Sequence, residues 1–232
     1  MIRNDALPGK FTLYLRRFLY FLKNEKFIKK LNYDWHKTSS RFEIINKIIL
    51  EKKFTSYLEI GCQNDVNFSK INIKNKIGVD PQTGGTHRMT SDEFFKQNNS
   101  SFDFIFIDGL HVYEQVLRDI ENSIKFINNN GVILVHDCLP SKIWHQTIPQ
   151  THSSWNGDVW KAIVKCRTMS KIDTYTIIAD QGLGLILNRN NREILELKNT
   201  NFKNLKFKDY YNNHKKFMRL INESEIFEIL KK

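Results

Sequence analysis

The chain has few cysteines, the residues whose disulfides stabilise small exported proteins. Three of its 232 residues are cysteines (Cys62, Cys138 and Cys166), and they show neither paired nor metal-ligand spacing. This count argues against a disulfide framework and favours a reducing compartment. No apolar stretch reaches the roughly 18 residues that suggest a membrane span. Arg16 and Arg17 interrupt what would be the apolar core of a signal peptide, so we expect a cytoplasmic protein.

Acidic residues are scarce relative to basic ones. The chain has 25 Asp and Glu against 36 Lys and Arg, a formal net charge of +11. Such an excess favours polyanionic partners such as nucleic acid, an anionic membrane surface or phosphorylated substrates. A Lys- and Asn-rich composition imposed by an AT-rich genome explains the excess equally well. The length favours one domain with extensions over two domains.

Two long apolar runs each stop abruptly at ionisable residues. Phe102–Ile107 ends at Asp108, and Gly131–Val135 ends at His136 and Asp137. Runs without alternation are typical of strands buried on both faces of a parallel sheet. The segment 111–127 between them has apolar residues at helical spacing. The pattern predicts a βαβ unit with its acids at the carboxyl edge of the sheet, where open α/β sheets bind ligands.

The remaining elements follow from periodicity and from turn residues. Asp180, Gln181 and Gly182 form a link too short for a parallel crossover, so the strands on either side must run antiparallel. The polar segments 128–130 and 188–192 are predicted loops. We predict strands over 56–60, 76–79, weakly 87–89, 102–107, 131–135, 174–179 and 183–187, and helices over 10–31, 38–52, from about 90, 111–127, 159–168 (capped by Asp158) and 210–230.

Five segments of the chain resemble the motifs of one enzyme family. They are Leu58–Gly61, Gly78–Pro81, Ile107–Tyr113, Gly131–Asp137 and Gly157–Ile163. Over residues 55–190 the chain is similar to class I S-adenosylmethionine-dependent methyltransferases, in their small-molecule and sugar O-methyltransferase-like branch. The resemblance implies an α/β fold, a Rossmann-like three-layer sandwich with a mostly parallel seven-stranded sheet and an antiparallel last strand. We expect a methyltransferase domain over 53–190, flanked by helical extensions at 1–52 and 191–232.

The same resemblance implies where S-adenosylmethionine would bind. Asp80, about 20 residues after Gly61, is placed to accept both ribose hydroxyls. The loop after Gly61 has no further glycine at 62–65, although glycine lets a backbone approach a ligand closely. The alternatives are that the acid of the first motif holds its own loop and that the polar pair near residue 91 only starts a helix. The implied cofactor-binding residues are Glu59, Gly61, Asp80, Ser91, Asp92 and Asp108.

Methyl transfer to a hydroxyl requires an aligned and deprotonated oxygen. The resemblance places four residues at this chemistry, and these catalytic candidates are Asp108, His111, His136 and Asp137. The two aspartates would offer oxygen ligands to Mg²⁺, and the histidines are candidates for a general base or for further ligands. Cys138 stands where relatives commonly have an amide or acid, and histidine ligands would suit Mn²⁺ or Zn²⁺. The alternatives are capping aspartates, a packing His111 and a core His136.

Two segments outside these motifs invite a functional interpretation. The loop 139–156 carries Trp144 and Trp155 with two histidines (His145 and His152), either as a wall for a sugar-like substrate or as anchors under the loop. The basic aromatic helix 10–31 fits an anionic membrane surface, a dimer contact or packing on the core. We expect O-methylation of a sugar, glycan precursor or other small molecule. The alternatives are a nucleic-acid methyltransferase, favoured by charge alone, and an inactive binding subunit, favoured by the glycine-poor loop.

Overall fold

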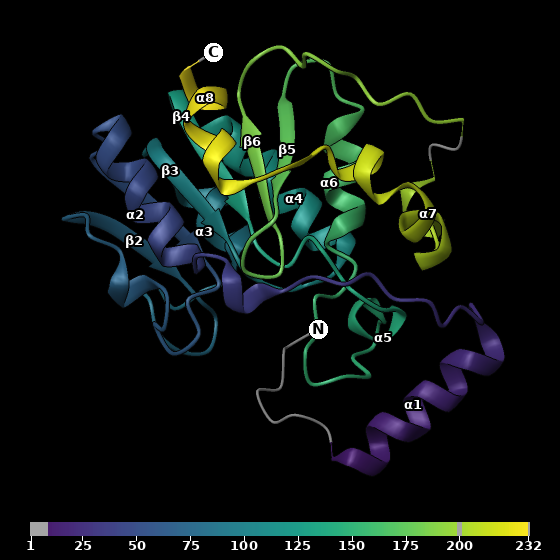
Figure 1. Cartoon of the computed structure of the whole chain (residues 1–232). Coiled ribbons are helices and arrows are strands. Elements are labelled where there is room, and N and C mark those ends of the chain that lie inside the picture. The colour runs from purple at the N-terminus through teal and green to yellow at the C-terminus, as the bar shows by residue number, and fades with distance from the viewer. Residues whose placement is uncertain (1–8, 199–200, 232) are drawn as a thin grey trace.

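The computed structural model describes residues 9–198 and 201–231, and one mixed sheet lies at its centre (Figure 1). Within these residues seven strands pair in the order β2-β1-β3-β4-β6-β5-β7. All neighbours run parallel except β6, which is antiparallel to both β4 and β5. The strands are β1 (Ser56–Ile60), β2 (Asn75–Val79), β3 (Phe102–Ile107), β4 (Ile127–Val135), β5 (Asp173–Ile177), β6 (Leu183–Leu187) and β7 (Leu220–Ile221). The expected α/β sandwich with its mostly parallel sheet is confirmed.

Helices cover both faces of this sheet, which explains the apolar runs without alternation. In β3, Phe104 and Phe106 enter a core that includes apolar residues of α2 and α8. Ile105 and Ile107 enter the opposite core, which includes residues of α3, α4, α6 and α7. The helices are α1 (Lys10–Lys23), α2 (Arg41–Lys52), α3 (Ser91–Gln97), α4 (Tyr113–Phe126), α5 (Ile143–Gln146), α6 (Trp160–Arg167), α7 (Phe207–Met218) and α8 (Ile226–Lys231).

The C-terminal segment differs from its prediction. The expected helix over 210–230 is wrong, because α7 stops at Met218 and Arg219 adopts a left-handed φ of 46°. The chain then pairs with β5 as β7, before α8 begins at Ile226. The predicted strand at 87–89 is also wrong: it is reduced to a single bridge between His87 and Val79.

Three smaller predictions also need correction. The helix predicted over 10–31 ends at Lys23. The predicted loop 128–130 belongs to β4, where the register against β3 shifts and Asn130 has a φ of 62°. Asp158 does not cap α6, whose N-cap position is Val159. Its carboxylate instead accepts a 2.7 Å hydrogen bond from the backbone N–H of Tyr113, at the start of α4.

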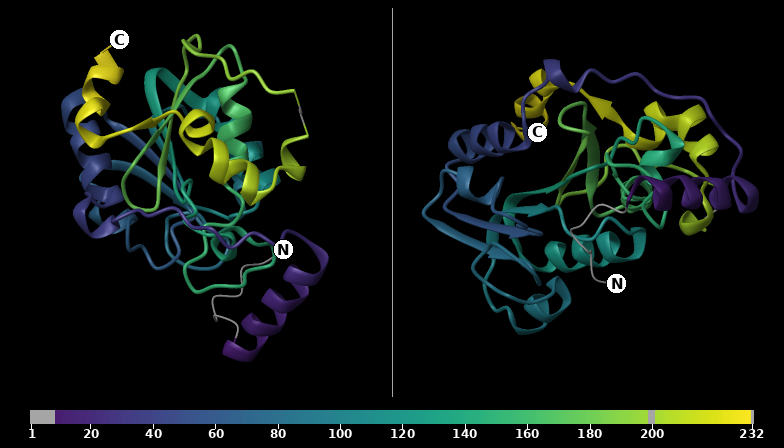
Figure 2. Two further views of the ribbon diagram at one scale, coloured as in Figure 1. Left: turned by 45° about the vertical axis from the view of Figure 1, so that its right-hand side comes forward. Right: turned by 90° about the horizontal axis from the view of Figure 1, so that it is seen from below.

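The two α-helices of the N-terminal extension differ in how they meet the core. Helix α2 begins with a capping box between Ser40 and Glu43 and packs its isoleucines on the sheet. Helix α1 lies apart from the sheet, beyond the loop that contains α5 (Figures 1 and 2). In the described ranges, no helix has the length and apolar character needed to cross a bilayer. The division of the chain at residues 52 and 190 stays a prediction.

Candidate active site at the carboxyl edge of the sheet

The carboxyl ends of β1, β3 and β4 bring the predicted site residues to one edge of the sheet. Two cavities open there, and they share Gly61, Gln63 and Asp108 among their lining residues. The first, which we call the α3–α4 cavity, has a volume of about 420 Å³, and the second, the histidine cavity, about 340 Å³. Asp108 thus stands between two adjoining spaces.

The α3–α4 cavity gathers five of the six predicted cofactor residues: Gly61, Asp80, Ser91, Asp92 and Asp108. Gly61 has a φ of 89°, and a Cβ on it would lie 2.2 Å from the carbonyl oxygen of Asp108. Only glycine allows this close approach of the two strand ends. The carboxylate of Asp80 accepts backbone N–H bonds from Gln63 (2.9 Å), Gln82 (2.8 Å) and Thr83 (3.0 Å), which fix it at the cavity.

The loop after Gly61 reaches a tight shape without further glycines. Gln63 and Asp65 take left-handed φ values of 49° and 58°. The carboxylate of Asp65 accepts a 2.7 Å hydrogen bond from the backbone N–H of Gly85, and this bond ties the loop to the segment after β2. Aspartate tolerates the left-handed region better than most residues. The absence of glycines at 62–65 therefore leaves the turn intact.

A buried acid that sequence reasoning missed lies beside Ser91. The Ser91 hydroxyl donates a 2.6 Å hydrogen bond to Asp119, whereas Thr90 is the residue that caps α3. Burial raises the pKa of Asp119 to about 6. Its second carboxylate oxygen, Oδ2, has no hydrogen-bond partner within the described residues, and Asp119 lines the α3–α4 cavity. An unpaired buried oxygen at a cavity favours a ligand that donates a hydrogen bond.

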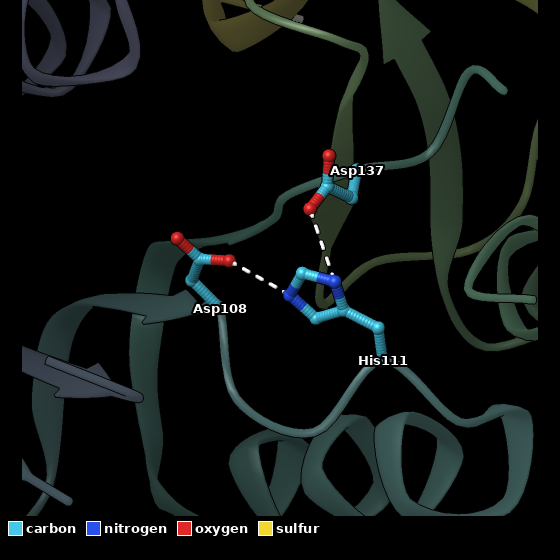
Figure 3. A group of neighbouring side chains, drawn as sticks. All are labelled: Asp108, His111 and Asp137. Atoms are coloured by element: carbon cyan, nitrogen blue, oxygen red, sulfur yellow. Dashed lines mark hydrogen bonds and ion pairs between the residues drawn. The ribbon is translucent and has the colours of Figure 1, made fainter. Parts of the chain in front are cut away.

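In the histidine cavity, the ring of His111 lies between two carboxylates (Figure 3). Its Nε2 is 3.2 Å from Asp108 Oδ1, and its Nδ1 is 3.2 Å from Asp137 Oδ2. Nδ1 also lies 3.1 Å from the backbone carbonyl oxygen of Trp155. Asp137 holds a left-handed φ of 62°, and non-glycine residues in this region are concentrated at functional sites.

His136 joins the same cluster and does not point into the core. Its Nδ1 lies 3.2 Å from Asp108 Oδ1 and 3.4 Å from Asp137 Oδ2. Burial lowers the pKa of His136, but the charges of Asp137 and Asp108 outweigh it and raise that pKa well above its usual value. Burial raises the pKa of Asp108, but His136, His111 and Arg41 hold it well below the usual range. The cluster therefore favours ionised Asp108 beside a protonated His136.

Two members of the cluster were not predicted. Arg41, the first residue of α2, places its Nη1 3.3 Å from His136 Nε2 and its Nε 3.8 Å from Asp108 Oδ2. Asp180, in the link between β5 and β6, lies 3.4 Å from His136 and accepts a 2.7 Å bond from the Arg41 backbone N–H. Both come from segments interpreted only as structure, and no motif marks them. The one available sequence signal was Asp180 itself, an acid in a very short link at the edge of the sheet.

The loop 139–156 contributes to the site through one of its tryptophans. The Trp155 ring stacks on His111 at a centroid distance of 5.4 Å and lines the histidine cavity. Asn156 donates a 2.9 Å bond to Asp137 Oδ1. Trp144 instead packs against Tyr20 of α1 and is not a lining residue of this cavity. The cavity-wall interpretation therefore fits Trp155, and the anchor interpretation fits Trp144.

Glu59 faces the histidine cavity instead of the α3–α4 cavity where it was expected. Its side chain accepts bonds from the Tyr57 hydroxyl (2.5 Å) and from Asn67 Nδ2 (2.8 Å). Burial raises the pKa of Glu59 to about 7. Its role as a cofactor ligand stays a prediction, and these contacts equally suit an acid that holds its own loop.

Three side chains at this edge of the sheet offer ligand atoms that suit a divalent cation. One ligand atom each from Asp108, His111 and Asp137 lies within 4.8 Å of the others. Two carboxylates and one imidazole form a mixed oxygen and nitrogen set that suits Mn²⁺ or Zn²⁺ as well as Mg²⁺. The sulfur of Cys138 is not available to such an ion, because Cys138 is fully buried and its thiol donates to the carbonyl oxygen of Val135.

Comparisons with known proteins agree with this geometry. Residues 52–138 match a family model described as a methyltransferase domain. The fold is similar to that of an O-methyltransferase from Bacillus cereus in complex with S-adenosylhomocysteine (SAH; TM-score 0.50, 11% identity, covering 80% of this chain and 94% of that one). It is also similar to SAH-bound PaMTH1, a methyltransferase from Podospora anserina (TM-score 0.51, 14% identity, covering 81% and 100%). A search of curated proteins found no match. The chain therefore has the Rossmann-like fold of these methyltransferases, and residues 52–138 resemble a methyltransferase domain.

Proposed function

We propose that this protein transfers the methyl group of S-adenosylmethionine to a hydroxyl oxygen of a sugar, a glycan precursor or another small molecule. One observation carries the proposal: the two cavities share Gly61, Gln63 and Asp108. A methyl donor in the α3–α4 cavity and an acceptor in the histidine cavity would meet at that boundary. Methyl transfer needs this in-line placement more than any other contribution from the protein.

The α3–α4 cavity suits the nucleoside part of the donor. Asp80 would accept the ribose hydroxyls, and the missing side chain of Gly61 lets the donor approach the strand ends. The unpaired Oδ2 of Asp119 would accept a hydrogen bond from an amino group such as that of adenine. Two relatives by fold, the Bacillus cereus and Podospora anserina proteins, bind SAH.

In the histidine cavity we assign the base to His111. With its Nδ1–H donated to the carbonyl oxygen of Trp155 and to Asp137, His111 would use Nε2 to take the proton of an acceptor hydroxyl that displaces the present 3.2 Å contact of Nε2 with Asp108 Oδ1. The protonated ring of His136, whose pKa is raised by Asp137 and Asp108, would hold these two carboxylates in place. A divalent cation held by Asp108 and Asp137 would lower the pKa of the hydroxyl.

Calorimetric titration of the purified protein with SAH tests the donor half of the proposal. We expect binding heat and a rise in melting temperature, because a ligand of the native state stabilises it. No heat and no thermal shift would favour the inactive binding subunit, or another ligand altogether.

Metal dependence is a separate test. Methylation of a panel of sugars and small alcohols would be measured before and after chelation with EDTA, and after addition of Mg²⁺, Mn²⁺ or Zn²⁺. Loss on chelation and recovery with one ion would support the cation at Asp108 and Asp137. Full activity in EDTA would remove the cation and leave His111 as the unassisted base.

The charges of the histidine cavity disfavour nucleic acid as the acceptor. The acids Glu59, Asp108 and Asp137 line it together with the cations Arg41 and protonated His136. Among the residues that the structure describes, the cavity therefore offers no excess of positive charge that would hold phosphates. Acceptor binding should therefore change little with salt, whereas binding driven by phosphate contacts would fall steeply as ionic strength rises.

A further inference from the structure

Helix α1 carries an exposed apolar face that points away from the protein. Seven apolar residues recur at helical spacing along one side of it. Their exposed fractions run from 39% for Phe21 to 81% for Phe11. They are Phe11, Tyr14, Leu15, Phe18, Leu19, Phe21 and Leu22. An amphipathic helix normally buries this side against the core, and here the orientation is reversed.

The opposite side of α1 attaches the helix to the protein through two hydrogen bonds and an aromatic contact. Arg16 Nη1 donates to the carbonyl oxygen of Gln150 (3.1 Å), and Arg17 Nε donates to that of Thr151 (2.8 Å). Tyr20 packs edge-on against Trp144, with ring centroids 6.1 Å apart. These contacts leave the apolar side of α1 exposed. The helix itself lies at the edge of the molecule (Figure 2).

The charge around this apolar face has one sign. The sequence has no acid from Lys10 to Asn24, while seven Lys and Arg residues lie between positions 10 and 30. At 100° per residue, Lys10 and Lys23 flank the two edges of the apolar side. Glu25, the one acid of this stretch, is buried, and its carboxylate accepts backbone N–H bonds from α7. The outward surface is therefore apolar with a basic rim.

We propose that α1 binds this protein to an anionic membrane surface. The apolar side would enter the boundary between headgroups and acyl chains, and the flanking lysines would reach the lipid phosphates. The helix, about 21 Å long at 1.5 Å per residue, would lie in the plane of the membrane. A second copy is a poorer occupant of this face, because two basic rims would be brought together without any acid between them.

This attachment would connect the membrane to the active-site edge. The loop that receives Arg16 and Arg17 also supplies Trp155, whose ring stacks on His111. The histidine cavity would then be held near the lipid surface by the loop that forms its wall. An acceptor carried on a membrane lipid would suit this placement, although membrane binding itself does not depend on the methyltransferase proposal.

Sedimentation of the full chain with lipid vesicles tests the proposal. We expect binding to vesicles of equal parts phosphatidylcholine and phosphatidylglycerol and little binding to phosphatidylcholine alone. Phe11→Glu with Phe18→Glu should abolish binding. Leu50→Glu is the matched control, since Leu50 of α2 is 80% exposed but lies outside α1, and it should bind as the native protein does.

A second variant, in which lysines of α1 are neutralised, tests membrane binding without changing the apolar side chains. Lys10→Gln with Lys23→Gln should weaken binding roughly 30-fold, from about 1 kcal/mol for each basic residue at an anionic surface. Equal binding to neutral and anionic vesicles, or loss of binding in Leu50→Glu, would overturn the proposal. So would absence of vesicle binding together with a dimer in light scattering that Phe18→Glu dissociates, which would assign the face to a second copy.

Discussion

The two cavities at the sheet edge share a wall but are assembled in different ways. The α3–α4 cavity is built from consecutive strand ends and the loops that follow them, between residues 60 and 119. The histidine cavity draws Arg41 from α2, Trp155 from the long loop and Gln181 from the hairpin, in addition to strand ends. One space depends on local sequence, and the other depends on the whole fold being in place.

Each cavity also contains one buried acid whose pKa is raised by burial, and the two acids differ in their partners. Asp119, with a pKa of about 6, keeps one oxygen without a partner in the described residues. Glu59, with a pKa of about 7, is bonded by Tyr57 and Asn67. In the α3–α4 cavity, a carboxylate oxygen of Asp119 can therefore accept a hydrogen bond from a ligand. In the histidine cavity, Glu59 is bonded to neighbouring side chains, and His111 and Asp137 are the residues proposed to take part in the reaction.

The largest effect on turnover should come from Asp137, which lines the histidine cavity and not the α3–α4 cavity. Asp137→Asn removes the charge that holds His111, while asparagine still tolerates the left-handed backbone. We expect turnover to fall about 10²- to 10⁴-fold, the range of a lost acid–base contribution. The dissociation constant of SAH should stay unchanged by calorimetry. Asp34→Asn, at an exposed acid that lines neither cavity, is the control. Weakened SAH binding in Asp137→Asn would place Asp137 on the donor side.

The next largest effect should come from disrupting the close packing of Gly157 against His111. Gly157 has a φ of 60°, and a Cβ on it would lie 1.8 Å from the carbonyl oxygen of His111. Gly157→Ala should lower the free energy of unfolding by about 3 kcal/mol, combining strain with displacement of the His111 segment. Urea denaturation measures this. Gly9→Ala, where nothing lies within 4 Å of the added Cβ, should leave stability within experimental error. Equal stability of the two variants would show that the segment shifts freely.

The buried acid of the α3–α4 cavity predicts a pH dependence of stability. Its folded pKa of about 6 lies above the ordinary aspartate pKa of 3.8, so ionisation of Asp119 costs stability. The cost is absent below pH 3.8, grows between pH 3.8 and 6, and is complete above pH 6. Asp119→Asn should therefore gain stability relative to the native protein as the pH rises through this window, by an amount on the order of 2 kcal/mol.

Denaturation of the ligand-free protein at pH 4.5 and pH 7 measures this difference. Asp92→Asn, at an exposed acid of the neighbouring helix, is the matched control and should show no such trend. A pH-independent difference between Asp119→Asn and the native protein would mean that the Asp119 carboxyl keeps its ordinary pKa despite its burial.

The sequence predicted those parts of the site whose residues follow strands directly. Gly61, Asp80 and Asp108 could be placed because apolar runs end at them, and parallel strands end at one edge. Arg41 and Asp180 could not, since their role depends on how α2 and the hairpin pack against β4. The missed β7 has the same cause: two residues pair with β5 only after α7 has turned the chain back. Local patterns predict elements, but not the tertiary contacts that recruit distant side chains.

The smallest expected effect is on binding of the methyl donor in the α3–α4 cavity. Asp80 is held at the α3–α4 cavity by the backbone N–H groups of Gln63, Gln82 and Thr83. Asp80→Ala should raise the dissociation constant of SAH about tenfold or more, as expected for a lost charge-assisted hydrogen bond. Turnover at saturating donor should change little, because Asp80 does not line the histidine cavity. An unchanged dissociation constant would remove Asp80 from the ribose site, whereas a loss of turnover at saturation would mean that the two cavities do not divide binding from chemistry.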